Sequence, residues 1–187
     1  AKPHPRVQYF AFSNNTGASH TSETQSFYSE QNIRWKISKT SPLDLTGQLT
    51  LRSGEDNDNF KLGIRVRFNN VKSLEAFFRK IGLMYSLNFH VLEYHPVESV
   101  RSFVQFEHAY QWWLLPDRLN RRLYIGGFAD QNFRAGSEQD EVMWVSEHQL
   151  GIRIVDQFYL VAEFRINDFL PSDNYGLGYG LEYKIVF

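Results

Sequence analysis

Apolar residues occupy every second position over long stretches of this chain. In the segment NFKLGIRVRFNN the apolar set runs from Phe60 to Phe68, and the intervening residues include Lys61, Arg65 and Arg67. Successive side chains of a β-strand point to opposite faces, so this segment would have one apolar face and one basic face. The same alternation recurs in LDLTGQLTLRS, IGLMYSLNFHV, SFVQFEHAYQWWL and QFYLVAEFRIN. The pattern predicts an all-β fold.

Turn residues divide the chain into about ten expected strands, within a range of about eight to twelve. The expected strands lie near residues 6–14, 26–38, 43–53, 59–69, 80–93, 101–114, 122–133, 142–155, 157–167 and 174–187. The segment VKSLEAFFRK is the exception, because it has a short helical stripe between two strands. The length of 187 residues fits a single domain that covers residues 1–187.

Composition excludes several classes of protein. The 20 basic and 21 acidic residues nearly cancel, so we expect no nucleic-acid partner. The absence of cysteine excludes a disulfide framework, a thiolate metal site and a cysteine nucleophile. No apolar run approaches the roughly 18 residues of a membrane-spanning helix, and no apolar leader follows AKPHPRVQ. We expect neither a cofactor nor a metal site.

The expected connectors fall into two alternating classes. TSPLD, LPDRLN and VDQ are short, whereas NTGASHTSETQ, SGEDNDN, RAGSEQDE and NDFLPSDN are mostly longer and rich in acidic and small polar residues. Two connectors, NNVKSLEAFFRK and YHPVES, break the alternation. Short turns at one end and long polar loops at the other are typical of a closed, up-and-down transmembrane β-barrel with antiparallel strands.

Alternation alone does not tell whether the apolar face points inward or outward. A soluble lipocalin-like barrel has the same period, with apolar residues inside. A barrel of about eight strands has an interior only just wide enough for its own side chains. Ten apolar strand faces rich in Tyr, Phe and Trp would overfill it, so we favour a lipid-facing apolar surface. Aromatic residues near the expected strand ends agree with interfacial girdles. These residues are Trp35, Trp112 and Phe187 at the short-turn end and Trp144, Phe169 and Tyr175 at the long-loop end.

The last strand ends in YGLGYGLEYKIVF, in which Tyr179, Leu181, Tyr183 and Ile185 precede the final Phe187 at every second position. This segment resembles the C-terminal strand of Gram-negative outer-membrane β-barrel proteins. The resemblance implies a location in the bacterial outer membrane, contact with outer-membrane lipid and lipopolysaccharide, and recognition by the barrel-assembly machinery.

The polar face of such a barrel would line its lumen. The charged residues expected there are Arg34, Lys36, Arg52, Lys61, Arg65, Arg67, Glu107, Glu147, Arg153, Glu163, Arg165, Glu182 and Lys184. They could form the charged wall of a narrow pore, or they could pair across a filled interior that only stabilises the barrel. We expect Glu147 and Glu163 to form cross-strand ion pairs with Arg153 and Arg165.

An enzyme is the less favoured alternative. Lipid-active barrels place serine and histidine on the lipid-facing surface, and Ser146 and His148 share one strand face, with His108 on the apolar face of another strand. No acid or amide in the sequence is evidently placed to orient the histidine. The sequence therefore favours an outer-membrane channel or export-associated pore with a charged lumen. A non-conducting subunit of an envelope complex is the alternative, followed by a lipid-modifying enzyme.

Overall fold

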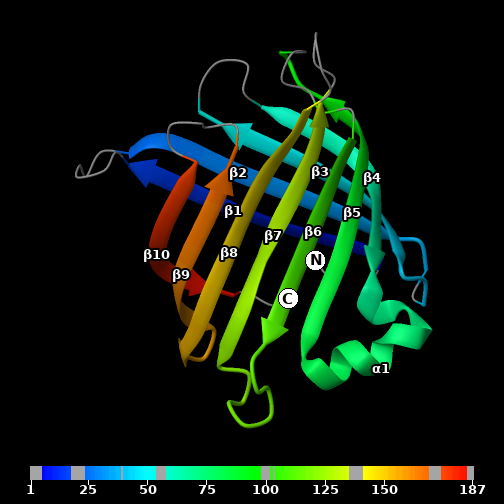
Figure 1. Cartoon of the computed structure of the whole chain (residues 1–187), viewed down its shortest axis with the longest axis vertical. Helices are drawn as coiled ribbons and strands as arrows, with labels where there is room; N and C mark the ends of the chain where they lie inside the picture. Colours follow the sequence, from blue (N-terminus) through cyan, green and yellow to red (C-terminus); the bar gives the residue numbers. More distant parts are fainter. Residues whose placement is uncertain are drawn as a thin grey trace.

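Ten antiparallel strands form one sheet in which the strand order follows the sequence (Figure 1). The computed structural model describes residues 6–17, 24–38, 40–53, 58–97, 102, 104–134, 141–168 and 174–184. The elements are β1 (Val7–Gly17), β2 (Thr24–Lys36), β3 (Leu43–Arg52), β4 (Asn59–Arg67), η1 (Phe68–Asn70), α1 (Lys72–Ile81), β5 (Leu83–Tyr94), β6 (Val104–Trp113), β7 (Leu123–Arg134), β8 (Glu141–Val155), β9 (Phe158–Asn167) and β10 (Tyr175–Tyr183). The predicted all-β fold and its ten strands are confirmed. β1 and β10 are the two edges of the sheet, so the predicted closure into a barrel remains a prediction.

The sheet curls strongly, so that early strands pass behind later ones. In Figure 1, β1 and β2 lie behind β5 to β8 and cross them at an angle. The curl brings Gln48 of β3 to Glu107 of β6, with 3.3 Å between the amide nitrogen and a carboxylate oxygen. It also brings the Tyr124 hydroxyl of β7 to the Glu182 carboxylate of β10. The sheet therefore has a concave face, across which distant strands touch, and a convex face.

Polar residues are buried and apolar residues are exposed, which is the reverse of the distribution in a water-soluble domain. On β3, Asp44 and Gln48 are buried on the concave face, whereas Leu45 and Leu49 are exposed on the convex face. The other buried polar residues include Asn32, Arg34, Thr46, Thr50, Lys61, Asn88, His90, Gln105, Glu107 and Asn132. The buried apolar residues among the described part of the chain are Tyr124, Tyr159 and Val161. The concave face is thus polar, which is the opposite of the lipocalin-like alternative.

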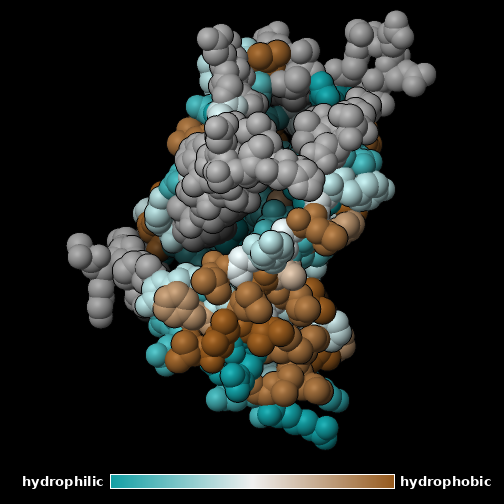
Figure 2. All heavy atoms as spheres, turned by 90° about the vertical axis from the view of Figure 1, so that its left-hand side faces the viewer, coloured by the Kyte–Doolittle hydropathy of each residue, from teal (hydrophilic) through white to brown (hydrophobic). Residues whose placement is uncertain are grey.

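Among the described side chains, the convex face of β3 to β10 is mostly apolar. Apolar side chains gather into a broad patch on the side of the molecule where β9 and β10 lie (Figure 2). The alternating residues that precede Phe187, together with Phe187 itself, are called the C-terminal signature. Among its described members, Tyr179 is 92% exposed and Leu181 is 71% exposed. Tyr183 is also exposed. The two remaining signature residues, Ile185 and Phe187, lie outside the described residues.

The aromatic residues expected near the strand ends lie on the convex face. Trp35 and Trp112 are exposed near the short-turn end, and Trp144 and Tyr175 are exposed near the long-loop end. Phe169, like Phe187, lies outside the described residues. The described members of both expected girdles therefore point away from the polar interior.

A bulge in β5 keeps polar residues on the concave face where the simple alternation breaks. Leu62 pairs with Leu92 and Gly63 pairs with His90, so Val91 is an extra residue. Val91 and Leu92 are both exposed on the convex face. A Cβ on Gly63 would lie 2.0 Å from the Phe89 carbonyl oxygen, so only glycine permits this close approach.

The long connector between β4 and β5 contains the helix that the sequence suggested. α1 lies at the end of the sheet that carries the β6–β7 and β8–β9 turns (Figure 1). It ends at Gly82, whose φ of 72° is the left-handed conformation that favours glycine at a helix C-terminus. In the described part of the chain, no helix has the length and apolar character needed to cross a membrane.

Candidate functional site

The concave face collects the charged residues that the sequence assigned to a lumen. Strand alternation places all of the following on this face or at its short-turn margin: Arg34, Lys36, Arg52, Lys61, Arg65, Arg67, Glu107, Glu147, Arg153, Glu163, Arg165, Glu182 and Lys184. Positive residues predominate on β2, β3 and β4, and carboxylates are concentrated on β6 to β10. The two groups of strands face each other across the curl, as the contact between Gln48 and Glu107 demonstrates.

The concave face of β2, β3 and β4 is called the basic wall. Asp44 is the buried counter-ion of two arginines on this wall. Its side chain is fully buried, with Arg67 Nε 2.9 Å and Arg65 Nη1 3.9 Å from its Oδ2 atom. Arg67 Nη2 also donates to the Ser41 carbonyl oxygen at 2.7 Å. One buried carboxylate therefore neutralises part of the charge of two neighbouring guanidinium groups. Arg65 and Arg67 were predicted from the sequence to line the interior, but Asp44 was not.

Glu93 is a second residue of the concave face that was not predicted from the sequence. Its carboxylate lies 3.7 Å from Lys61 Nζ, and it accepts hydrogen bonds from Asn59 Nδ2 at 2.6 Å and from the Ser102 backbone at 2.5 Å. A strict period of two from Asn88 would send Glu93 to the convex face. The bulge at Val91 reverses this orientation, and a bulge flanked by apolar residues leaves no clear signal in the sequence.

Amide side chains link the carboxylates in the middle of the concave face. Glu107 accepts hydrogen bonds from Asn88 Nδ2 at 2.8 Å and from Gln48 Nε2 at 3.3 Å. On the neighbouring strands, Gln105 contacts His90 Nδ1 at 2.9 Å and donates to Asp130 Oδ2 at 2.9 Å. Neutral amides thus connect acidic groups on β6 and β7 to the opposite wall and to β5.

The described residues of β8 and β9 do not form the expected ion pairs, although the register brings one carboxylate opposite an arginine. Glu147 stands directly opposite Arg165 in the β8–β9 ladder. Glu163 instead stands opposite Gln149, whose Nε2 donates to it at 3.2 Å. Arg153 is directed to the short-turn end, where its Nη2 donates to the Asn120 carbonyl oxygen at 2.5 Å. An ion pair between Arg153 and a carboxylate of these strands does not form among the described residues.

An aromatic cluster, formed by Trp113, Tyr124 and Tyr159, fills the concave face near the short turns. The rings of Tyr124 and Tyr159 meet edge to face at 5.5 Å, and those of Trp113 and Tyr124 at 5.4 Å. Tyr124 is only 2% exposed. Its ring lies on Gly151 of β8, where a Cβ would be 2.1 Å from a ring carbon. The missing side chain of Gly151 therefore makes the space for Tyr124.

Glu182 and Lys184 cover this aromatic cluster. Lys184 Nζ lies 3.8 Å from the Tyr124 ring centroid and 3.4 Å from Glu182 Oε2. Burial lowers the pKa of Lys184, and the negative charge of Glu182 opposes this effect. The Tyr124 hydroxyl lies within hydrogen-bonding distance of Glu182 and, at 2.9 Å, of Gln149. Cation–π and hydrogen-bond contacts thus join β7, β8 and the end of the chain across the interior.

Several buried polar atoms of the concave face lack a protein partner among the described residues. They include Thr46 Oγ1, Asn88 Oδ1, His90 Nε2 and Asp130 Oδ1. Burying such a group without a hydrogen bond costs about 1–3 kcal/mol. Their positions indicate an interior that is suited to water or to small polar solutes.

The two residues considered for catalysis lie on the convex side. His148 is bound through Nδ1 to the Tyr110 hydroxyl at 2.8 Å, across Gly127, which separates them in the ladder. His108 is bound in the same way to Tyr85 at 2.7 Å. Ser146 is buried beside Ala129. Each histidine is therefore oriented by a tyrosine, and no described contact joins Ser146 to His148.

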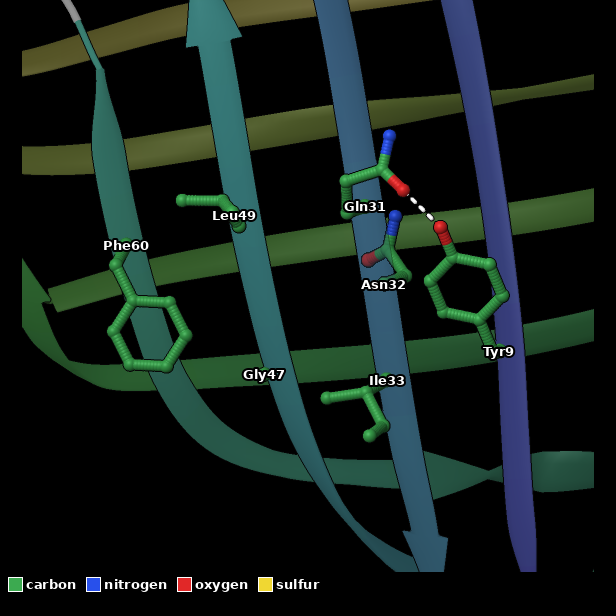
Figure 3. Close-up of a pocket in the computed structure, with 7 residues that line it drawn as sticks. All are labelled: Tyr9, Gln31, Asn32, Ile33, Gly47, Leu49 and Phe60. Atoms are coloured by element: carbon green, nitrogen blue, oxygen red, sulfur yellow. Dashed lines mark hydrogen bonds between the residues drawn. The ribbon is translucent and has the colours of Figure 1, made fainter.

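A shallow depression of about 180 Å³ also lies on the convex side (Figure 3). It forms over Gly47 and is bordered by Ile33, Leu49 and Phe60. The Tyr9 hydroxyl closes one side by donating to the Gln31 side chain. Its lining is apolar, so it lacks the convergent charged groups of the concave face.

Within the described residues, no group of three or more histidine and carboxylate side chains is arranged to hold a metal ion. The sequence matches no protein-family model, and no curated protein or solved structure is significantly similar to it. The chemistry of the concave face is therefore the basis for a functional assignment.

Replacement of Asp44 by Asn should lower the free energy of unfolding by about 3 kcal/mol, because it leaves Arg65 and Arg67 without their buried counter-charge. Urea titration of the folded protein measures this change. Asp117→Asn removes an exposed carboxylate at the short-turn end and should change stability by less than about 0.5 kcal/mol. Equal effects of the two substitutions would contradict the role given to Asp44.

Gly151→Ala should destabilise the protein by about 2 kcal/mol, because the new methyl group would displace the Tyr124 ring. The same substitution should have little effect when Tyr124 is already Ala. Gly178→Ala on β10 is the matched control, since its Cβ would lie no closer than 3.6 Å to Glu163. If Gly151→Ala costs as much without the Tyr124 ring, this packing explanation is wrong.

Proposed function

We propose that this chain is an integral β-barrel of the bacterial outer membrane, with its apolar convex face in lipid and its polar concave face around a narrow lumen. The reversed burial supports this proposal most directly, because exposed leucines and tyrosines are favourable against acyl chains. The strands contain nine to fifteen residues, which is enough for tilted strands to cross a bilayer. The exposed Trp35, Trp112 and Trp144 suit interfacial positions.

Closure by pairing of β1 with β10 completes this proposal. An even number of up-and-down strands makes these two edges antiparallel, so they can form a regular ladder. In a bilayer each unpaired backbone group costs several kcal/mol, which favours closure. The alternation of Tyr179, Leu181 and Tyr183 on the exposed face of β10 supports recognition by the barrel-assembly machinery.

For activity, we propose a low-conductance channel for small polar solutes. The buried polar atoms without protein partners support a hydrated interior. Basic residues predominate on β2 to β4 and carboxylates are concentrated on the strands that face them, so the field runs across the passage and gives little preference for anions over cations. The aromatic cluster with Lys184 narrows the passage at the short-turn end.

Membrane insertion can be tested with single cysteines, because the chain has none of its own. We expect nitroxide labels at Leu45→Cys, Leu160→Cys and Tyr179→Cys in phospholipid vesicles to collide more with oxygen than with a water-soluble nickel complex. A label at Asp117→Cys, on an exposed connector, should have the opposite preference. Preferential collision with nickel at all four positions would contradict a lipid-facing convex face.

Planar-bilayer recordings test the channel. The refolded protein should give small, infrequent openings, and Tyr124→Ala should raise the unit conductance because it removes the central ring of the aromatic cluster. Tyr179→Ala, which removes an exposed ring from the convex face, is the matched control and should leave conductance unchanged. Silence of the folded wild type and of Tyr124→Ala would reject the channel and favour a non-conducting subunit of an envelope complex.

A further inference from the structure

The two ends of the sheet differ in charge. The four connectors at the short-turn end, residues 37–42, 68–82, 114–122 and 156–157, contain seven Lys or Arg and three Asp or Glu. The five long-loop connectors, residues 18–23, 53–58, 95–103, 135–140 and 168–174, contain one Arg and nine Asp or Glu. This difference is hidden in the overall charge of −1. The short-turn end is therefore suited to an anionic surface.

α1 has the residue distribution of an interfacial helix. Leu74, Phe77, Phe78 and Ile81 form one apolar stripe at helical spacing, and the basic residues lie away from it. Phe77 is 57% exposed, although it belongs to the apolar stripe. An amphipathic helix with an exposed aromatic ring and a basic opposite face is the type that lies at the boundary between headgroups and acyl chains.

Contacts with the sheet hold α1 beside the convex face. Tyr85 points outward from β5. Its ring packs at a tilt against Phe68 of η1, with 5.0 Å between the ring centroids, and stacks with Phe78 of α1 at 6.4 Å. Asn69 fixes the connection, because its side chain accepts from the Tyr85 amide at 2.8 Å and donates to the Leu83 carbonyl oxygen at 2.6 Å. The helix therefore sits on the side of the sheet that faces lipid in the proposed barrel.

The β6–β7 connector continues this surface. Trp112 donates from Nε1 to the Ile81 carbonyl oxygen at 2.8 Å, and Pro116 packs against Gly82. Backbone hydrogen bonds from Leu119 to Leu115 and from Arg121 to Pro116 order the connector. Met84, Trp112 and Leu115 are exposed apolar residues of this surface, and Arg118 and Arg121 of the same connector are exposed as well. We define the basic rim as Lys72, Arg79 and Lys80 of α1 together with Arg118 and Arg121 of this connector. The exposed Arg122 is not included, because its side chain donates to the Arg153 and Ile154 carbonyl oxygens.

We propose that the basic rim binds the headgroups of anionic phospholipids in the leaflet at the short-turn end, while Phe77 and Trp112 insert among the upper acyl carbons. This inference rests on the proposed membrane insertion but not on channel activity. A phospholipid surface fits because it offers negative headgroups and an apolar layer side by side, as the rim offers cations beside exposed aromatic rings. Glu75, which lies 4.0 Å from Arg79, is the acidic residue of α1 and reduces the positive charge.

Quenching of Trp112 fluorescence by brominated lipids provides a local test. Trp35, Trp113 and Trp144 are replaced by Phe, and the protein is reconstituted in phosphatidylcholine vesicles with a fixed fraction of brominated phosphatidylglycerol or brominated phosphatidylcholine. We expect the apparent binding near Trp112 to be several-fold stronger for phosphatidylglycerol than for phosphatidylcholine. At low ionic strength, neutralising each basic residue to Gln should reduce this preference by up to about fivefold, and high salt should weaken it. Glu75→Gln should increase it.

Trp144 as the single tryptophan is the matched control at the acidic end, where no preference for phosphatidylglycerol is expected. Equal quenching of Trp112 by both lipids would overturn the lipid inference and leave membrane insertion intact. A preference that survives neutralisation of the whole rim would also overturn it. If inorganic phosphate at matched ionic strength competes with phosphatidylglycerol, the basic rim binds free anions rather than lipid headgroups, and the lipid inference is wrong. Absence of quenching by every brominated lipid would reject membrane insertion itself, and the inference with it.

Discussion

Mutual pairing of polar side chains across the concave face is the interaction on which this sheet depends. The buried apolar cluster contains only Tyr124, Tyr159 and Val161 among the described residues, which is too small to drive a curl over ten strands. The curl is instead stabilised where Gln48 meets Glu107 and where Tyr124 meets Glu182. In such an interior each charge needs its partner, because an unpaired buried charge costs more than a well-paired one contributes.

Strand alternation made most of the fold predictable. A period of two survives over most of the described strand residues because one face is polar and the other apolar, so strand positions and facing residues could be inferred without distant contacts. Glu93 was missed because the bulge at Val91 shifts the phase of β5 by one residue. Val91 and Leu92 are both apolar, and the critical partner, Gly63, lies on another strand.

Contacts between distant strands could not be predicted from the sequence. Nothing local to Tyr124 indicates that its ring rests on Gly151 or that its hydroxyl reaches Glu182 on the last strand. Likewise, Ser146 and His148 share a face as expected from their spacing, yet the partner of His148 is Tyr110, two strands away. Such pairings depend on curl and register, which residue spacing within one strand does not determine.

The bond between Tyr124 and Glu182 has a consequence for how this architecture can evolve. The contacts that narrow the interior at the short-turn end are the same contacts that tie β10 to β7. A substitution that widens the interior there also loosens an edge strand, whose concave face carries Gly176, Gly178 and Gly180 and therefore offers few other side-chain contacts. In this chain a wider interior therefore comes with a less firmly attached last strand. A protein that evolves from it with a wider interior would need other contacts to hold its last strand.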